Sequence, residues 1–277
     1  MGPKIRIATY NIFLNLHYWQ KRLPLIVDEL NALNADIICL QEVVLPRNTA
    51  QEIADRLKGN YYVTTVVHDD NLSSNSDLAL AILSKQKPIE VSKLYLGSKE
   101  KRIAMRATFK KGMQEFDVVN THLYWKPYNF FHKRIRLGQV KRLLSWAMSD
   151  REVVICGDMN ATPRTKAMRY FEKRGYRSSY RLAMGHEPDW TCANPVGHPE
   201  RTLRDRIALY FYNIVKRGKI GIWRGVLDYV LVTQKFKVLA VGIFGDKPSA
   251  ENRRIYPSDH RGVYADVRLP LWSNNRG

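Results

Sequence analysis

The sequence predicts an α/β fold: one domain over residues 1–277, built on two packed β-sheets. The chain is long enough to bury a sizeable core, and 45% hydrophobic with 11% aromatic residues is typical of a globular protein. Strand-helix units are mixed with hairpins along its length, which is the pattern of helices packed onto sheets. No repeat, low-complexity tract or shift in composition marks a linker.

Apolar patterns identify the strands. The stretch IRIATY alternates as a strand should, and ADIICLQEV contains the apolar run of a buried strand. The turn KKGMQ joins two strands into a hairpin. In chain order, strands are predicted at 5–10, 35–43, 61–67, 78–83, 89–95, 103–109, 115–121, 226–232, 236–243 and 262–268, with a further buried strand at the start of VVICGDMNATP.

Helical spacing of apolar residues predicts helices at 23–34, 48–58, 133–148 and 164–174. Pro24 stands near the start of the first, and Asn48 is a plausible N-cap of the second. The third is basic, and its predicted inward face consists of Ile135, Val140, Leu143, Leu144 and Ala147.

Charge indicates which partners the protein would attract. Lys and Arg number 45 against 26 Asp and Glu, so the net charge is +19. Such an excess speeds association with polyanions and favours nucleic acid or an anionic membrane surface as partner, although a basic solvated surface gives the same composition. Charge therefore indicates a class of substrate and no reaction, and nothing in the sequence indicates an oligomeric state.

The cellular compartment is predicted from three features that the sequence lacks: a membrane span, a signal peptide and a cysteine motif. No apolar run approaches the ~18 residues needed to span a bilayer, and MGPKIRIATYNIF enters a strand without the apolar core of a signal peptide. Cys39, Cys156 and Cys192 have neither a CxxC nor a zinc spacing, and the first two lie in apolar runs. Buried free thiols in a reducing compartment are expected, and thus a cytoplasmic protein.

Polar residues recur where apolar strands end. They fall in six short signatures: TYN (Asn11), LQE (Glu42), NTH (His122), GDMN (Asp158, Asn160), LDY (Asp228) and SDH (Asp259, His260). Strand ends on one edge of a sheet converge on a common rim. Carboxylate and amide oxygens suit Mg²⁺, with Mn²⁺ as an alternative, and no thiolate cluster suits zinc. This set combines a metal site, two imidazoles and an acid, and it contains no obvious protein nucleophile. The combination predicts phosphoryl transfer to water.

The ordered blocks TYN, LQEV, NTHL, GDMNATP, LDYVLV and SDHRGVYADV, spread over residues 4 to 268, resemble the endonuclease/exonuclease/phosphatase superfamily. The resemblance implies the deoxyribonuclease I-like fold, a four-layered α/β sandwich of two packed mixed sheets flanked by helices. It also implies a Mg²⁺-dependent phosphodiesterase.

The resemblance assigns a role to each residue of the blocks. Glu42 would be the principal Mg²⁺ ligand, supported by Asn11 and Asp259. Asp158 would orient or deprotonate the attacking water, and Asn160, two residues on in the strand and so pointing the same way, would hold that water or a phosphate oxygen.

The resemblance also gives the two histidines separate roles. His260 would stabilise charge on the phosphoryl group as imidazolium, with Asp228 fixing its tautomer and raising its pKa. His122 would protonate the leaving group, and its partner would be Asp77, the only acid close to the neighbouring-strand segment SNSDLALAIL.

Two segments that are peculiar to this sequence bear on the substrate. Residues 123–136, LYWKPYNFFHKRIR, are aromatic and basic, with Trp125, Lys126, Lys133 and Arg134 as candidate substrate-binding residues. Residues 201–225 are similar in composition. Basic residues interleaved with aromatics suit nucleic acid, the favoured substrate, and equally the headgroup region of a membrane, as in a sphingomyelinase-like phospholipid phosphodiesterase. An inert helix packed on the sandwich, and a non-catalytic nucleic-acid-binding protein, are the remaining interpretations.

Overall fold

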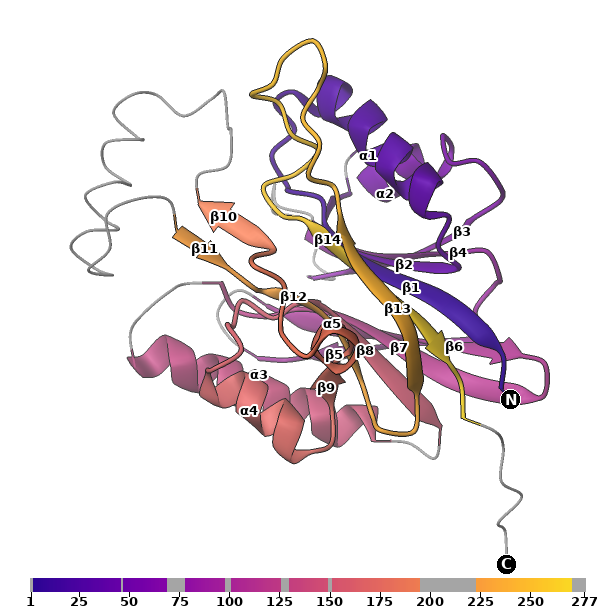
Figure 1. The fold of residues 1–277 in the computed structure, drawn as a ribbon, viewed down its shortest axis with the longest axis vertical. Helices are drawn as coiled ribbons and strands as arrows, with labels where there is room; N and C mark the ends of the chain where they lie inside the picture. Colours follow the sequence, from indigo (N-terminus) through magenta and orange to yellow (C-terminus); the bar gives the residue numbers. More distant parts are fainter. Residues whose placement is uncertain are drawn as a thin grey trace, which may run out of the picture.

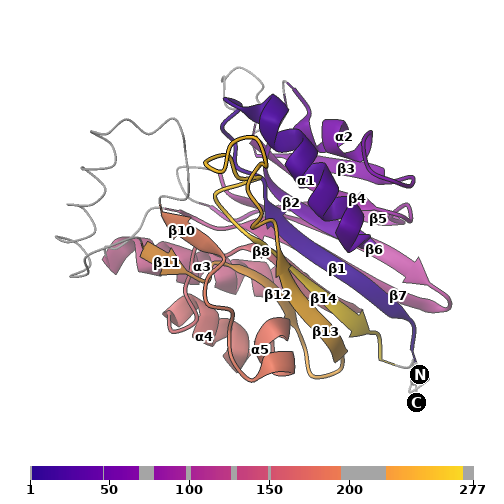
Figure 2. The ribbon, with the colours of Figure 1, turned by 45° about the horizontal axis from the view of Figure 1, so that its top comes forward.

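A computed structural model describes residues 2–45, 47–68, 78–97, 101–125, 130–148, 151–194 and 223–270. Two six-stranded sheets lie face to face, and helices cover the outer face of each (Figures 1 and 2). This is the predicted four-layered α/β sandwich, and the two mixed sheets confirm the fold class.

The first sheet holds both the amino-terminal strand and the last strand of the described chain. Its spatial order is β13 (Lys237–Phe244), β14 (Gly262–Arg268), β1 (Lys4–Asn11), β2 (Ile37–Val44), β4 (Leu78–Ser84) and β3 (Tyr62–Val67). The β1–β2 pair is parallel, and the other pairs are antiparallel.

The second sheet is built on the same plan from the middle of the chain. Its order is β5 (Glu90–Tyr95), β6 (Ile103–Lys111), β7 (Gln114–His122), β8 (Glu152–Asp158), β12 (Asp228–Val232) and β9 (Arg177–Ser178). Here β7 and β8 are the parallel pair. Two short strands, β10 (Cys192–Asn194) and β11 (Trp223–Gly225), form a separate antiparallel pair.

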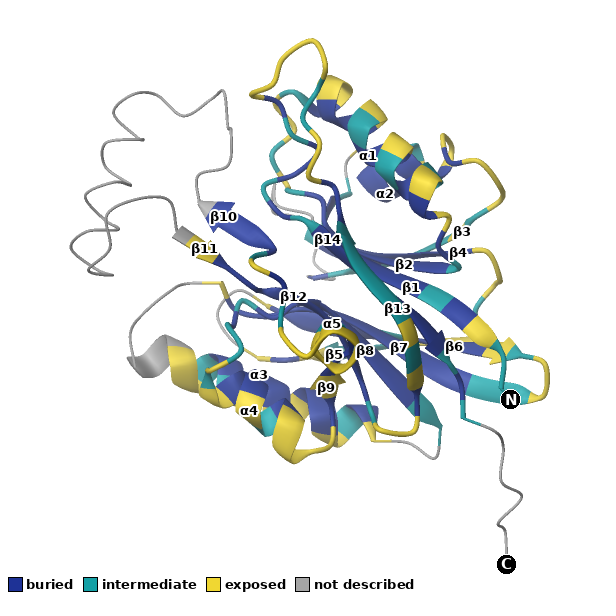
Figure 3. Ribbon diagram, in the orientation of Figure 1, coloured by how far each residue is buried: buried dark blue, intermediate teal, exposed yellow. Residues whose placement is uncertain are grey.

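Helices complete the outer layers. Trp19, Leu23, Ile26 and Leu30 of α1 (Trp19–Leu33), with Ala50 and Ile53 of α2 (Thr49–Ala54), pack on the first sheet. The apolar side chains of α3 (Phe130–Ala147) and α4 (Lys166–Lys173) pack on the second. A short helix, α5 (Ser179–Met184), follows β9. Each long helix has a buried side toward its sheet and an exposed side away from it (Figure 3).

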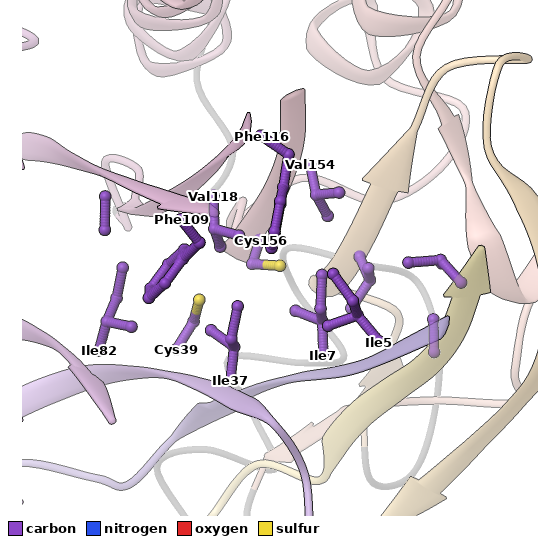
Figure 4. Close-up of a cluster of buried hydrophobic side chains, with 14 of the residues drawn as sticks. Ile5, Ile7, Ile37, Cys39, Ile82, Phe109, Phe116, Val118, Val154 and Cys156 are labelled. Atoms are coloured by element: carbon purple, nitrogen blue, oxygen red, sulfur yellow. The ribbon is translucent and has the colours of Figure 1, made fainter. Parts of the chain in front are cut away.

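Between the sheets lies a core of buried apolar side chains. Ile5 and Ile7 of β1 point into this core, whereas Ala8 and Tyr10 of the same strand contact the helix layer. Because successive side chains of a strand face opposite sides, strands covered on both faces have continuous apolar runs. Cys39 and Cys156 enter this core from opposite sheets (Figure 4), and with Cys192 they are buried free thiols, as predicted.

Helix ends and short strands are where the structure departs from the predicted elements. Helix α1 begins at Trp19, before the predicted start, so Pro24 lies inside it. Helix α2 ends at Ala54, four residues before its predicted end. The Asn48 side chain caps α2 as predicted, because it accepts from the Gln51 N–H at 3.3 Å. The elements β9, β10, β11 and α5 were not predicted, because none is long enough to show a period.

Further predictions concern the later helices. In α3, Val140, Leu143, Leu144 and Ala147 are buried as predicted, while Ile135 is half-buried. The segment 201–225 lies outside the described residues except for its last three, which form a strand and no helix. Among the described helices, none combines the length and hydropathy needed to cross a membrane.

Candidate active site

Strand register places three of the predicted residues in one row. His122 ends β7 and lies opposite Asp158, the last residue of β8. On the other side of β8, Asp158 lies opposite Asp228, the first residue of β12. The first sheet faces this row with Asn11 at the end of β1 and Glu42 near the end of β2. The site therefore lies where both sheets end, as the signatures predicted.

Asp158 is the centre of this group, with its side chain only 1% exposed. Its Oδ2 is 3.3 Å from His122 Nε2 and 3.8 Å from His260 Nε2. The same oxygen accepts from Asn11 Nδ2 at 3.2 Å. Burial alone would raise the pKa of Asp158, but the two imidazoles outweigh it and hold this pKa below its usual range. The carboxylate is therefore ionised and its orientation is fixed.

His260 is the second half of a carboxylate–imidazole pair. Its Nδ1–H donates to Asp228 Oδ2 at 2.9 Å, so that Nε2 faces Asp158. Burial alone would lower the pKa of His260, but Asp228 and Asp158 raise it well above its ordinary value. Since the ring lies between two buried carboxylates, its charged imidazolium form is favoured.

Glu42 is delivered to the site by an irregularity in β2. The β2–β4 register shifts between Leu40 and Val43, and Glu42 has a left-handed backbone with φ of 60°. A bulge of this kind re-aims a side chain at the cost of local strain. The half-buried carboxylate is then held at both oxygens: Oε1 accepts from Asn11 Nδ2 at 3.0 Å and Oε2 from the Leu14 N–H at 2.8 Å.

Two sets of side chains fit a metal ion. Glu42 with the Asn11 amide offers the hard oxygen donors that Mg²⁺ prefers. Asp158, Asp228 and His260 form the second set, with ligand atoms all within 4.8 Å of one another. In that set Asp228 Oδ2 already accepts a hydrogen bond from His260 Nδ1.

Asp259 and Asn160 reach the site through their neighbours. Ser258, next to Asp259, donates from Oγ to the Asn11 carbonyl at 2.6 Å and accepts the His260 N–H at 3.2 Å. Asn160 lies beyond β8, which ends at Asp158, and has φ of 45°. The alternation argument for Asn160 was therefore wrong. Its backbone N–H donates to Asp158 Oδ1 at 2.8 Å, and its amide donates to the Leu123 carbonyl at 3.1 Å.

Several buried polar residues support the site and were not singled out from the sequence. Gln41 Nε2 donates to Asn120 Oδ1 at 2.7 Å across the two sheets, and Asn120 Nδ2 donates back to the Leu40 and Ala81 carbonyls. Thr191 Oγ1 accepts the Asp228 N–H at 3.1 Å. Gln41 and Asn120 stand inside the quoted blocks LQEV and NTHL, so their position beside Glu42 and His122 was the available signal.

Three of the four predicted substrate-binding residues are described by the structure, and all three are exposed. Trp125 follows His122 by three residues and is 51% exposed, while Lys133 and Arg134 are exposed on α3. Lys126, like Asp77, lies outside the described residues. The preceding Tyr124 is anchored, because its N–H donates to Gln139 and its carbonyl accepts from Arg136.

These residues define a class of chemistry. The site combines a buried carboxylate between two imidazoles with a fixed carboxylate–amide pair that suits a hard cation. Such groups are typical of a hydrolase that directs water at an ester and stabilises the negative charge that develops. The model of the Endonuclease/Exonuclease/phosphatase family matches residues 8–260, and the chain belongs to this family.

Known proteins agree with this assignment. The chain is 26% identical to 2′,5′-phosphodiesterase 12 of Bos taurus, over 92% of this chain and 46% of that protein. It superposes on the human Nocturnin catalytic domain with bound sulfate anion with a TM-score of 0.70 (23% identity, 96% of this chain, 95% of that one). With D. rerio TDP2 complexed with single-strand DNA product the TM-score is 0.73 (17% identity, 96% and 99%).

The chain spans about half the length of the curated relatives it matches, 46% of the phosphodiesterase and 58% of rat Nocturnin. Family and fold together support the prediction of a hydrolytic, phosphodiesterase-like enzyme.

Proposed function

We propose that this chain is a divalent-metal-dependent phosphodiesterase that hydrolyses nucleic acid, with Mg²⁺ as the cation and Mn²⁺ as a substitute. The observation that carries the proposal is Asp158 held between His122 and His260 beside the Glu42–Asn11 pair. Glu42 and Asn11, with support from Asp259, would hold the cation. When bound, the cation supplies Lewis-acid stabilisation of the charge that builds on the phosphoryl oxygens.

The chain's own residues perform the remaining steps. Asp158 orients the attacking water, because its lowered pKa keeps the carboxylate ionised and able to accept the hydrogen bond of that water, and the proton of the water passes to this carboxylate as the new bond forms. Asn160 keeps Asp158 Oδ1 in position through its N–H. The His260 imidazolium, fixed by Asp228, faces the same space and neutralises phosphoryl charge. His122 protonates the leaving oxygen.

Nucleic acid is the substrate that charge and relatives both support. The net charge is +19, and exposed Trp125, Lys133 and Arg134 follow His122 in the chain. Cations bind phosphates and aromatic faces stack unpaired bases. Among the relatives, one is named a 2′,5′-phosphodiesterase and another holds a single-strand DNA product.

A substrate panel with Mg²⁺ tests the proposal: single- and double-stranded DNA, RNA, a 2′,5′-linked oligonucleotide, a tyrosyl-DNA adduct, sphingomyelin vesicles and bis(p-nitrophenyl) phosphate. We expect turnover of at least one polynucleotide and none of sphingomyelin. Turnover of sphingomyelin alone would support the phospholipid alternative and overturn the proposal. Tight polynucleotide binding without turnover of anything would support the non-catalytic interpretation instead.

The metal assignment has its own variant. Glu42→Gln keeps the shape of the side chain and removes the charge assigned to the cation, so the Mg²⁺ concentration for half-maximal activity should rise and kcat should fall by orders of magnitude. Glu115→Gln, at the opposite end of the second sheet, is the matched control and should behave as wild type. Wild-type turnover of Glu42→Gln at limiting Mg²⁺ would refute the assignment.

A further inference from the structure

A cluster of two arginines and a tryptophan lies next to His260. The Arg261 guanidinium carbon is 3.5 Å from the centroid of the Trp190 ring, and that of Arg224 is 5.3 Å from the same centroid. Trp190 and Arg261 are half-buried, whereas Arg224, in β11, is exposed. We call this group the Arg224–Trp190–Arg261 cluster. Stacking on an indole fixes the plane of a guanidinium while its edge N–H groups keep their capacity to donate.

Backbone contacts join this cluster to the residues of the active site. Arg261 follows His260 directly, and its N–H donates to the Thr191 carbonyl at 2.6 Å. The residue after Thr191, Cys192, forms an isolated β-bridge with His260. Thr191 Oγ1 in turn accepts the Asp228 N–H. The cluster is therefore positioned by the same contacts that position the Asp228–His260 pair.

The acidic side chains near Arg261 are Asp246 and Asp189, and both are exposed. Arg261 Nη2 lies 3.4 Å from Asp246 Oδ2, a carboxylate that is 43% exposed. Arg261 Nε is buried without a hydrogen-bond acceptor among the described residues, and Arg224 forms no ion pair within that part of the chain. Two guanidiniums held together against their repulsion form a site prepared for an anion.

We propose that the Arg224–Trp190–Arg261 cluster binds a non-scissile phosphate of the polynucleotide, next to the phosphate that is cleaved. This inference rests on the proposed function and specifies it, because it requires a substrate with at least two phosphates in a chain. Arginine forks match phosphate oxygens in two-point contacts. A bis-ester or a phospholipid with a single phosphate would leave the cluster unused.

Binding and turnover each test this subsite. A fluorescent single-stranded hexanucleotide is titrated with protein in EDTA, which prevents metal-dependent cleavage, at several salt concentrations. Each phosphate contact contributes about 0.7 to the slope of log K against log salt, so Arg224→Ala should flatten the slope by about that amount. Arg224→Lys retains the charge and should restore most of the slope.

Turnover is compared between the hexanucleotide and a dinucleotide with one phosphate. Arg224→Ala should lower kcat/KM for the hexanucleotide at least tenfold more than for the dinucleotide. Arg174→Ala is the matched control, because Arg174 is also exposed and stacked on an aromatic ring, Tyr170, at 5.4 Å. It lies near β9, whose Arg177 pairs with Val232, the end of β12 away from Asp228. This variant should keep the wild-type slope and ratio.

The subsite proposal is overturned if Arg224→Ala keeps the wild-type slope, whether or not its Tm falls, since the cluster would then be a structural contact. It is also overturned if both substrates lose activity equally, or if Arg174→Ala has the same effect. Failure of the proposed function looks different: the wild-type protein would cleave neither substrate, while the binding titration would still decide the subsite.

Discussion

At one end of the sandwich Lys4 and Arg6 enclose a single carboxylate, that of Asp266, whereas at the other end two imidazoles share Asp158. Asp266 is 2% exposed, and it accepts from Arg6 Nε at 2.6 Å, from Arg6 Nη2 at 2.9 Å and from Lys4 Nζ at 2.8 Å. Arg6 and Asn11 lie on the same strand, about 17 Å apart at ~3.4 Å per residue. Strand β1 thus contributes to two groups of buried charged side chains that differ in kind.

The two carboxylates differ in the groups that balance their charge and donate hydrogen bonds to them. Asp266 has its charge matched by cations with good hydrogen-bond geometry, which contributes to stability. Around Asp158 the imidazoles approach Oδ2 at 3.3 and 3.8 Å, the Asn11 amide donates to the same oxygen, and the Asn160 N–H donates to Oδ1. Imidazoles at these distances, beside strained Glu42, are arranged for a reacting partner. Substitutions should therefore separate the two ends: activity is lost at one and stability at the other.

Asp158→Asn should have the largest effect on activity. The amide keeps the shape but not the charge that orients water, so we expect kcat to fall by about 10² to 10⁴ with little change in Tm. Asp117→Asn is the matched control, a buried aspartate five residues before His122 that accepts from Thr108 Oγ1 at 2.7 Å. A decrease confined to KM would make Asp158 a binding residue.

Asp228→Asn should have an effect of the same kind but smaller. Asp228 acts through His260, so its loss lowers the imidazolium fraction and frees the ring, and we expect a loss of roughly tenfold to hundredfold. The pH–rate profile separates this role from a structural one: the acidic limb should persist and the alkaline limb should move to lower pH, because the raised pKa of His260 falls. An unchanged profile would contradict the pairing.

At the opposite end, Asp266→Asn should cost about 2 kcal/mol of unfolding free energy while activity is retained, because charged hydrogen bonds are lost. Arg6, and then Lys4, hold the pKa of Asp266 below its usual range. Its ionised form therefore stabilises the fold above the unfolded value near ~3.9, and that contribution is lost as the pH falls through the folded value. Denaturant melts at pH 7 and pH 3 should differ less in the variant than in the wild type.

The smallest effect is expected at the exposed Trp125. If its ring stacks an unpaired base, Trp125→Ala should weaken single strands by ~1 to 3 kcal/mol and duplexes by less. Fluorescence titrations with matched single- and double-stranded oligonucleotides measure this difference. Equal weakening of both would assign Trp125 to packing, and loss of action on vesicles alone would assign it to a membrane surface.

The sequence predicted the strand ends well because each carries a local signal. A buried run followed by a polar signature fixes both the strand and the position of its last side chain, as for His122 and Asp158. It did not predict how Glu42 is aimed, since a bulge depends on the partner strand β4. Nor did it predict the Trp190 cluster: Arg224 and Arg261 meet there only because β10 pairs with β11 and Cys192 bridges to His260.

Gly157 is another residue whose role depends on a contact that the sequence did not show. Gly157 precedes Asp158 with φ of 144°, and a Cβ there would lie 1.9 Å from the Thr121 carbonyl oxygen of β7. The close approach of β7 and β8 at this point brings His122 and Asp158 together. In the sequence, Gly157 and Asp158 show only a turn-prone residue before an acid. Thr121, the neighbour that requires glycine at this position, is distant in the chain.

The Gln41–Asn120 hydrogen bond joins residues of opposite sheets, and the Asp228–His260 pair does the same, since His260 leads into β14 of the first sheet. Neither sheet by itself assembles the site. A partly folded form with one sheet intact would show strand signals in circular dichroism yet cleave nothing. During refolding, turnover should return only once the two sheets have docked, so that catalysis reports on the completion of folding.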